Sequence, residues 1–421
     1  MSHPGYPPPE EGLRRLQAAA AAPAPETVPL DAALGRTLAA AVAATRPQPP
    51  FNRAMMDGYA LLAARTPGRF PVRSLAAAGG RSPAVPPGSA ARILTGAPLP
   101  AGTDTVVEQE AVTLETGNPP VAVVARAVAP GRNVGRRGQE WEPGDLLLAP
   151  GQRLGPLEVG LLAALGRDPV VVAGRPRVAL VVTGDELAPP GRDPGPEGIW
   201  DANTPLFSAL VRRYGGEVGC TIRVRDDPAA VEQALETARA ARPHLILTTG
   251  GVSVGDRDYV IARLRAAGRL LFWRLDLHPG KAVAGAVWGD TPVLALSGSP
   301  GAALMGWFLV GAPLLVGLQG GRLPQRTGEA RLRAPFPKPT RETRYLRVRL
   351  QAGPAGLEAD AALPQGSDLL TAYRQLDAFA VIPAGSPPLP AGTPVRIHYV
   401  PGLGREALTW GPPAHTTGPE A

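Results

Sequence analysis

The most regular hydrophobic pattern in the chain begins near residue 176, where short apolar runs alternate with amphipathic segments. The run RVALVVT at 177–183 is nearly all apolar, as expected of a strand buried on both faces of a sheet. This alternation predicts an α/β domain with a mostly parallel sheet. Further strands are predicted at 217–224, 244–249 and 292–296, and helices at 205–213, 228–241, 259–267 and from about 300.

The chain on either side of this domain has a different pattern. Helices are predicted at 10–22, 30–44 and 157–165, and Pro29 and Asp31 open the second of them. Between about 51 and 142, short apolar runs at 91–94, 105–108 and 121–127 are separated by Gly and Pro turns, which indicates a β-rich module. Short strands return at 344–350, 379–383 and 395–399, typical of a small β-barrel or sheet.

These changes predict four domains. A discontinuous N-terminal helical domain comprises 10–50 and 143–175, and the β-rich module 51–142 is inserted into it. The α/β domain comprises 176–322 and the C-terminal β domain 323–405. The segments 1–9 and 406–421 are expected to be flexible.

Composition narrows the class of protein. The 421 residues are 44% hydrophobic and 19% charged, and 51 Gly and 51 Pro are spread without a period, which excludes collagen and favours a loop-rich globular protein. The single cysteine, Cys220, and the scattered histidines exclude a disulfide scaffold and a zinc module, and Cys220 is expected to be a buried core thiol. The first eleven residues lack the features of a secretory signal, so a cytoplasmic protein with no membrane span is expected.

The net charge of +7 comes almost entirely from arginine, because Lys281 and Lys338 are the only lysines. The basic residues are dispersed and no nucleic-acid-binding motif accompanies them. The excess of basic residues is interpreted as solvated surface charge or as charge that attracts an anionic small substrate. No nucleic acid is expected as a partner.

The densest chemical signal is TTGGVSVGDRD at 248–258. A strand ends in Gly250 and Gly251, whose lack of side chains lets backbone N–H groups approach an anion, and Ser253 follows. Asp256 and Asp258 would repel a bare phosphate, so the segment predicts phosphate together with Mg²⁺. A tight strand-to-helix turn capped by Asp256 is the alternative.

Of four further segments, three fall at predicted strand ends or helix starts, where open sheets bind ligands, and the fourth, 278–281, places a cation beside a Gly turn. Acids in 183–186 are either cation or substrate ligands or solvated loop charges, and Asp201 and Asn203 are either ligands or helix caps. The segments 278–281 and 297–300 suit an oxyanion or are simply turns. The segments 56–59 and 95–98 read as isolated turns.

The chain resembles the molybdopterin molybdenumtransferases, the MoeA family that includes the gephyrin E-domain. Six segments of the chain occur in the same order as in that family. They read PPFNRAMMDGYAL, LTGAPLPAGTDTVVEQE, VVTGDEL, WDANTPLF, LTTGGVSVGDRDYV and HPGKAV. The likeness runs from about residue 10 to 400, and the combination of MDGYA, TGAPLP and TGGVSVGDRD is highly specific.

The resemblance implies a three-layer α/β domain of the molybdopterin-binding type, an inserted β-rich module and a C-terminal β-barrel-like domain. It implies a Mg²⁺-assisted reaction in which molybdate is inserted into adenylylated molybdopterin and AMP is released. It also implies a homodimer whose site is shared between subunits. A separate molybdopterin adenylyltransferase is a possible partner.

The resemblance assigns roles to particular positions. Glu186, Asp201 and Asp258 match acids that bind Mg²⁺ or position the substrate, and with Lys281 they form the catalytic set. The expected substrate-binding positions are Asp57 and Thr95 from the partner subunit, Glu140, Thr183, Gly184, Asn203, Gly250, Gly251, Ser253, His278, Gly298, Ser299 and Pro300.

The chain departs from the family pattern at several of these positions. His278 stands for a usual Lys, and its charge is only partial near neutral pH. Ser297 and Ser299 stand for Pro and Asn, Ala54 for Ser, and Ala302 for a hydroxyl residue. Glu140 falls where an Asp is usual. These changes bear on oxyanion binding more than on the fold.

Other functions remain open on the sequence. A paralogue that binds molybdopterin as a scaffold, with insertion weakened or lost, would explain the departures at 278, 297 and 299. A nucleotide-processing hydrolase would share only the α/β domain and would not explain MDGYA and TGAPLP. The choice between molybdate and tungstate, and the apo-enzymes that receive the cofactor, are left open.

Overall fold

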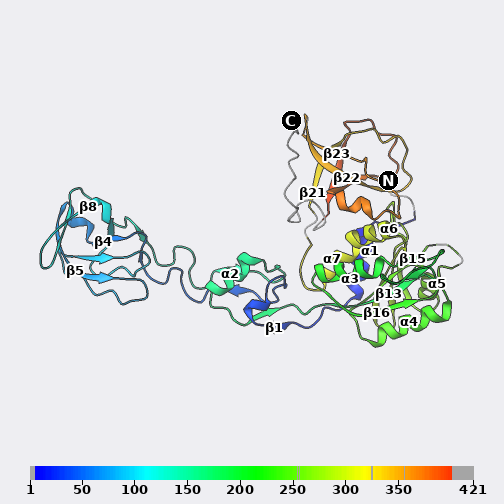
Figure 1. Cartoon of the computed structure of the whole chain (residues 1–421), viewed down its shortest axis with the longest axis horizontal. Coiled ribbons are helices and arrows are strands. Elements are labelled where there is room, and N and C mark those ends of the chain that lie inside the picture. The colour runs from blue at the N-terminus through cyan, green and yellow to red at the C-terminus, as the bar shows by residue number, and fades with distance from the viewer. Residues whose placement is uncertain (1–4, 254, 256, 324–325, 355, 401–421) are drawn as a thin grey trace, which may run out of the picture. The chain divides into compact units, whose positions relative to one another are not determined.

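A computed structural model describes residues 5–253, 255, 257–323, 326–354 and 356–400 of the chain, shown in Figure 1. Asp256, the segment 1–4 and the predicted flexible segment 406–421 lie outside the described residues. The chain forms two compact units. Unit 1 comprises Met1–Ala39, Pro150–Gly155 and Pro169–Ala421, and unit 2 comprises Ala40–Ala149 and Pro156–Asp168.

The centre of unit 1 is a six-stranded sheet in the order β16-β13-β17-β20-β19-β18. The first four strands are parallel, which confirms the predicted parallel sheet. β19 pairs antiparallel with both β20 and β18. The strands β18 and β19 extend the sheet beyond the predicted elements. The bounds are β13 (Arg177–Thr183), β16 (Glu217–Val224), β17 (Leu245–Thr249), β18 (Arg269–Trp273), β19 (Ala284–Trp288) and β20 (Thr291–Leu296).

Helices cover both faces of this sheet, as a three-layer α/β domain requires. One face packs against α1 (Pro9–Ala19), α3 (Asn203–Arg213) and the helix Pro300–Gly317, around the fully buried Trp307. The other face packs against α4 (Pro228–Ala240) and α5 (Tyr259–Ala266). Two buried apolar layers therefore hold the strand ends in fixed positions.

The helix Pro300–Gly317 is continuous but not uniform. It consists of α6 (Pro300–Gly306), a π-helical stretch (Trp307–Gly311) and α7 (Ala312–Gly317). By length and hydropathy it could cross a membrane, yet 83% of it is buried inside the structure. Trp307 meets the rings of Phe207 and Tyr214 edge-on, with centroids 5.8 and 6.0 Å apart. This helix is therefore part of the core.

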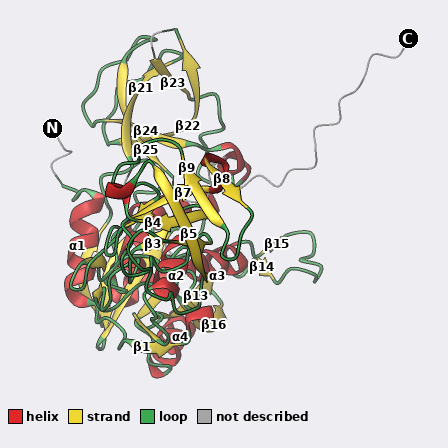
Figure 2. Ribbon diagram, turned by 90° about the vertical axis from the view of Figure 1, so that its left-hand side faces the viewer, coloured by secondary structure: helices red, strands yellow, loops and turns green. Residues whose placement is uncertain are grey.

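A closed five-stranded barrel follows in unit 1, in the order β21-β23-β22-β24-β25. Its strands are labelled in Figure 2. Its interior is apolar, with Val348, Ile382 and Ile397 fully buried. This confirms the barrel that the C-terminal pattern predicts. The bounds are β21 (Thr327–Leu332), β22 (Arg344–Gly353), β23 (Gly356–Asp360), β24 (Ala378–Ile382) and β25 (Pro394–Tyr399).

Two expectations for this part of the chain are wrong. Residues 30–44 do not form a helix: a single 3₁₀ turn spans Leu30–Ala32, and Leu38 then donates its backbone N–H to the carbonyl of Gln152. Cys220 is half-buried rather than buried, because β16 is an edge strand with β13 as its one neighbour in the sheet. Burial still raises the pKa of its thiol.

Unit 2 contains a second six-stranded sheet in the order β7-β4-β6-β5-β9-β8, which confirms the β-rich module. Its bounds are β4 (Gly58–Leu61), β5 (Gly68–Ala76), β6 (Ala90–Ile93), β7 (Thr105–Glu108), β8 (Val112–Glu115) and β9 (Val121–Val124). The unit also has α2 (Pro156–Ala164) and the strand pairs β2 (Val42–Ala43) with β11 (Leu146–Leu148) and β3 (Arg53–Ala54) with β10 (Val134–Gly135). Strand pairing thus replaces the second half of the expected helix 30–44.

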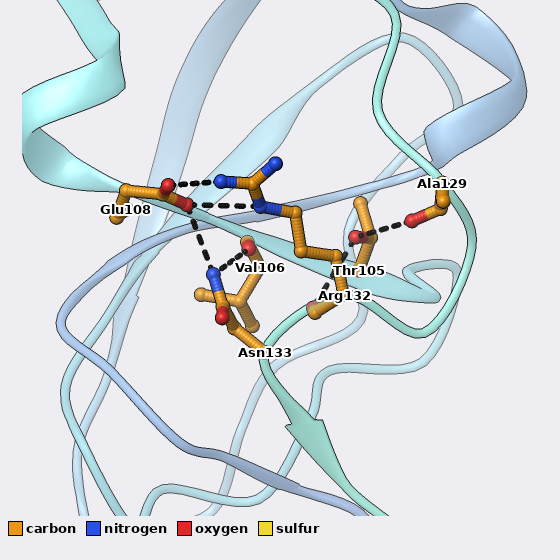
Figure 3. Close-up of polar contacts among 6 residues, drawn as sticks. All are labelled: Thr105, Val106, Glu108, Ala129, Arg132 and Asn133. Carbon is orange, nitrogen blue, oxygen red and sulfur yellow. Dashed lines mark hydrogen bonds and ion pairs between the residues drawn. The ribbon is translucent and has the colours of Figure 1, made fainter.

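A polar network fixes the end of β7 in unit 2 (Figure 3). The Glu108 carboxylate accepts hydrogen bonds from the Arg132 guanidinium and, at 2.9 Å, from the Asn133 amide. Hydrogen bonds from its own backbone N–H and from Arg132 hold the pKa of Glu108 below its ordinary value. The Thr105 hydroxyl also donates to the Ala129 carbonyl at 3.2 Å. Hydrogen bonds at both ends of β7 therefore bind the segment 129–133 to this strand.

Candidate active site at the carboxyl edge of the parallel sheet

The parallel strands of unit 1 bring several predicted site segments to one edge. Thr183 at the end of β13 is in register with Val224 at the end of β16, and Thr249 at the end of β17 with Leu296 at the end of β20. The segments that begin at Gly184, Gly250 and Ser297 therefore start side by side. Ligands of open α/β sheets bind at this edge.

Two glycines let these segments approach one another closely. Gly250 has a φ of +97°, and a Cβ on it would lie 2.4 Å from the Thr183 hydroxyl oxygen. A Cβ on Gly298 would lie 3.4 Å from the Cα of Gly250. The Gly250 N–H donates to the Leu296 carbonyl at 3.0 Å, so the ends of β13, β17 and β20 are in close contact. Such bare backbone is suited to contact an anion.

Asn203 joins a fourth segment to this edge. Its side-chain amide donates to the Gly298 carbonyl at 2.8 Å. The residue is only 6% exposed, and its Oδ1 atom has no hydrogen-bond partner among the described residues. A buried acceptor of this kind is available to a donor on a ligand.

Asp201 lies at the start of α3 and is almost fully buried. It accepts hydrogen bonds from the Thr204 backbone N–H at 2.9 Å and the Thr204 hydroxyl at 2.5 Å, and it pairs with Arg223 at 2.8 Å. Burial alone would raise the pKa of Asp201, but these partners outweigh it and the pKa lies below its ordinary value. Asp201 thus accepts a helix-capping hydrogen bond at the start of α3, the role that the sequence left open as the alternative to a ligand role, and Arg223 adds a positive charge beside it.

Glu186 lies in an acidic group formed by the ends of β13 and β16. The Asp226 backbone N–H donates to Asp185 at 3.3 Å, and the side chain of Arg225 lies 3.7 Å from Asp185. Burial and the charges of Asp185 and Glu186 raise the pKa of Asp226. Gly184 contacts Glu186 directly, since a Cβ on Gly184 would lie 2.8 Å from a Glu186 carboxylate oxygen.

Asp258 immediately precedes α5 and accepts the Gly255 backbone N–H at 2.5 Å. The Gly251 carbonyl accepts the Ile261 backbone N–H at 2.9 Å, so α5 is bound to the start of the glycine-rich segment. Ser253, between these anchors, is exposed.

The carboxylates expected to bind Mg²⁺ do not form a ready-made site. Among the residues that the structure describes, no group of three or more His, Cys, Asp or Glu side chains is placed to hold a metal ion. Asp201 is already paired with Arg223, and Asp258 with a backbone N–H. The set Glu186, Asp201 and Asp258 therefore does not fit a resident Mg²⁺ site with three protein ligands.

The loop 278–281 lies against the first turn of α6. Gly280 has a φ of +99°, and a Cβ on it would lie 2.8 Å from the Ala302 carbonyl oxygen. Ser299 and Pro300 begin the helix, and the Ser299 carbonyl accepts the first intrahelical N–H, that of Ala303. The positive end of a long helix and a basic loop are thus adjacent, which favours an anion.

Lys281 in this loop is paired with an acid that the sequence did not single out. Its Nζ lies 2.9 Å from Oε1 of Glu342, and Nδ1 of His278 lies 3.5 Å from Oε2. Burial and the nearby Arg344 lower the pKa of His278. Burial would raise the pKa of Glu342, but Lys281 and His278 outweigh it and lower that pKa. No motif marks Glu342, because it comes 61 residues after Lys281 in a loop.

Arg347 of β22 is a second residue that the sequence did not reveal. It is fully buried, its Nη2 donates to the Gly366 carbonyl at 2.8 Å, and its Nε and Nη1 atoms have no partner among the described residues. A Cβ on Gly301 would lie 3.2 Å from Nη1, so the guanidinium lies under the first turn of α6. Its polar position in an alternating strand would predict a side chain that faces solvent, so the sequence gives no sign of its burial.

Trp273 supports the glycine-rich segment from β18. Its indole N–H donates to the Val252 carbonyl at 3.0 Å. Two guanidiniums lie over the ring, that of Arg265 4.4 Å and that of Arg274 4.7 Å from its centroid. The indole is thereby held in place.

The predicted residues of unit 2 form their own contacts. Oδ1 of Asp57 accepts both the backbone N–H and the hydroxyl of Thr95, each at 2.7 Å. These two bonds hold the pKa of Asp57 below its ordinary value. Glu140 is exposed, and its backbone N–H donates to the Gln48 carbonyl at 2.9 Å. The structure thus joins Asp57 and Thr95, which the sequence alone leaves as separate turns.

Comparison with known families covers most of the chain. Residues 8–166 match the MoeA N-terminal region (domain I and II), residues 179–316 match a probable molybdopterin binding domain, and residues 329–400 match the MoeA C-terminal region (domain IV).

Curated relatives and solved structures match over nearly the full length. The molybdopterin molybdenumtransferases of Staphylococcus epidermidis and Bacillus subtilis are each 30% identical, over 87% and 88% of this chain and 89% of each relative. Two solved structures of the molybdopterin biosynthesis MoeA protein from Pyrococcus horikoshii have TM-scores of 0.80 and 0.79 and identities of 30% and 28%. They cover 93% and 94% of this chain, and 98% and 100% of their own chains are covered.

Proposed function

The chain belongs to the molybdopterin molybdenumtransferase family, enzymes of molybdenum cofactor biosynthesis, and from this premise we propose that it inserts molybdate into adenylylated molybdopterin and releases AMP. The observation that supports this best is the meeting of bare backbone from Gly250 and Gly298 at the carboxyl edge of the sheet. The first turn of α6 and Lys281 supply positive charge in the same domain.

In this proposal the chain acts mainly by positioning and by neutralising charge. Molybdate and a phosphorylated dithiolene are both anions and repel each other strongly where water is excluded. The N–H groups of residues 251–253 and of Gly301 at the start of α6 would bind the phosphate oxygens. The N–H groups of Gly250 and Ala302 already donate to the carbonyls of Leu296 and Ser367, and Pro300 has no N–H. Lys281 and His278 would contact the oxyanion, and Asn203 would accept a hydrogen bond from the substrate through its buried Oδ1.

We propose that the reaction uses Mg²⁺ and that this cation arrives with the substrate. Mg²⁺ in phosphate-binding enzymes is commonly held by one or two carboxylates and by the phosphates themselves. Glu186 and Asp258 are the candidate carboxylates, because Asp201 is committed to Arg223 and Thr204. When bound, the cation would neutralise phosphate charge and polarise the phosphoanhydride.

The family resemblance also motivates the proposed assembly. In a homodimer, Asp57 and Thr95 of the partner subunit would complete the site, and Glu140 would contribute to substrate binding. The chain would work in the cytoplasm on a small-molecule substrate, in sequence or in contact with a molybdopterin adenylyltransferase.

The proposal is tested by AMP release from adenylylated molybdopterin with purified protein and Mg²⁺, with and without molybdate. We expect release to depend on molybdate, and Asp258→Asn to abolish it while leaving the folded state intact. The matched control is Asp290→Asn, since Asp290 lies in the turn between β19 and β20, away from the carboxyl edge. Release by Asp258→Asn at the native rate would overturn the role of Asp258.

The scaffold function is favoured by one observation, the pairing of Lys281 with Glu342. A protein that only binds molybdopterin would retain the phosphate-binding backbone while its oxyanion cation remained occupied. Bound but uncleaved adenylylated molybdopterin at saturating molybdate would establish this second function.

A further inference from the structure

Glu342 is placed so that it can occupy the basic side chains of the loop 278–281. Its carboxylate side chain is 17% exposed, whereas Lys281 and His278, which it contacts, are 44% and 38% exposed. The acid is therefore the most buried member of the group, and the two basic groups remain accessible from solvent. A ligand could reach Lys281 without opening the structure.

The backbone fixes the position of this acid relative to the loop. His278 donates its N–H to the Thr343 carbonyl at 2.9 Å, and the His278 carbonyl accepts the Tyr345 N–H at 3.0 Å. Thr343 is anchored in turn, since its backbone N–H and hydroxyl donate to Asp276 at 2.9 and 2.7 Å. The residue beside Glu342 is thus bound on two sides, and the contact with Lys281 does not depend on a free loop.

We infer that Glu342 is an internal counterion that occupies Lys281 and His278 until an oxyanion displaces it, and that it thereby sets the affinity of this site for tetrahedral oxyanions such as molybdate. The inference rests on the proposed function, because it takes Lys281 as an oxyanion ligand. It adds a residue that determines affinity, and it does not make Glu342 a catalytic residue.

Electrostatics gives the direction of the effect. A carboxylate and a dianion that bind the same ammonium group repel each other, so the bond between Lys281 and Glu342 must weaken when the dianion binds. The lowered pKa of His278 leaves its imidazole mostly neutral near pH 7, so Lys281 is the main cation that Glu342 neutralises. Arg344, at the start of β22, lies close enough to His278 for its charge to lower the pKa of His278 as burial does. Removing the carboxylate should therefore strengthen oxyanion binding.

The test is direct binding of molybdate to the full chain by isothermal titration calorimetry, with no pterin present. Four proteins are compared: wild type, Glu342→Gln, Lys281→Met and the double variant. The control is Glu329→Gln, which makes the same change at an exposed position of β21. We expect Glu342→Gln to bind molybdate about fivefold more tightly, the scale of a partly exposed ion pair. We expect this gain to shrink in the Lys281→Met background.

Steady-state kinetics adds a readout that a merely structural role would not change in the same way. A competing counterion predicts that Glu342→Gln lowers KM for molybdate and leaves kcat nearly unchanged. If Glu342→Gln binds molybdate no more tightly than wild type while Lys281→Met binds it less tightly, the inference is wrong and the proposed function stands. If Lys281→Met binds molybdate as wild type does, Lys281 is not an oxyanion ligand, and both that part of the proposed function and the inference fall.

Discussion

Asp57 and Thr95, 38 residues apart, are joined by two hydrogen bonds from one residue to one carboxylate oxygen. The backbone N–H of Thr95 fixes the position of Asp57, and the hydroxyl adds the interaction that contributes most to the low pKa of the carboxyl group. The pair explains why an Asp-Gly turn and a Thr-Gly turn far apart in sequence belong to one surface of unit 2.

Replacing Thr95 by Val should raise the pKa of Asp57 toward its ordinary value. The variant keeps the backbone N–H bond and loses the hydroxyl bond, so the carboxylate is less stabilised relative to the protonated acid. The measurement is a carboxyl ¹³C NMR titration of Asp57, with Thr95→Ser as the control that retains the hydroxyl. An unchanged titration midpoint in Thr95→Val would show that the hydroxyl does not set this pKa.

Replacing Trp273 by Phe should loosen the glycine-rich segment. Phe keeps an aromatic ring in contact with Arg265 and Arg274 but cannot donate to the Val252 carbonyl. The loss of one hydrogen bond, about 1 kcal/mol, predicts roughly fivefold faster amide hydrogen exchange at residues 250–253 and slower AMP release.

The control for this variant is Trp288→Phe, which also removes an indole N–H donor. Trp288 donates to Glu236 of α4 at 2.7 Å and does not contact the segment 250–253. Equal changes of exchange at 250–253 in both variants would contradict a specific role for Trp273.

Arg223→Met should destabilise the folded chain by about 1–2 kcal/mol. It leaves the buried Asp201 carboxylate without its cation, although the bonds from Thr204 remain, and Arg223 itself is 42% exposed, which limits the loss. The measurement is the free energy of unfolding in urea for wild type, Arg223→Met, Asp201→Asn and the double variant. Adding Asp201→Asn to Arg223→Met should restore part of the stability, and purely additive losses would show that the pair is not coupled.

The strands of the parallel sheet were predictable because both faces are buried. The run at 177–183 is apolar on consecutive positions and forms β13 over the predicted residues. Parallel strands place their carboxyl ends at one edge, so the sequence could also predict that the segments after Thr183 and Thr249 meet. The meeting of Gly250 with Thr183 is a direct consequence of this register.

Long-range pairing is what the sequence could not predict. The alanine-rich segment 30–44 has helical propensity, yet Gly35 adopts a φ of +74° and the backbone that follows bonds to distant residues such as Gln152. In the same way, local sequence gives no sign that Glu342 would face Lys281 or that Arg347 would lie under Gly301. Such contacts depend on how the barrel docks on the α/β domain within unit 1, which local patterns do not encode.

The free energy of unfolding should increase as the pH rises from about 5.5 to about 7.5. Burial is the largest cause that lowers the pKa values of His244, His278 and His398 below 6.5, so the folded chain favours neutral imidazoles. Between the folded pKa values and 6.5 the unfolded chain binds more protons. The folded chain therefore has its full stability when the pH is above the unfolded histidine pKa of 6.5. It loses stability as the pH falls below that value, because the unfolded chain then takes up protons. Carboxylates with lowered pKa values, such as Asp201, lose their stabilisation only at lower pH.

His398→Phe should make this pH dependence smaller. His398 is 9% exposed, its Nε2 has no partner among the described residues, and its ring meets Tyr345 edge-on at 6.2 Å, a contact that Phe can retain. Each unit of pKa difference between folded and unfolded chain corresponds to about 1.4 kcal/mol of pH-dependent stability. Urea unfolding of both proteins at the two pH values measures the difference. Equal pH dependence in wild type and His398→Phe would mean that the other two histidines, and not the barrel imidazole, are responsible.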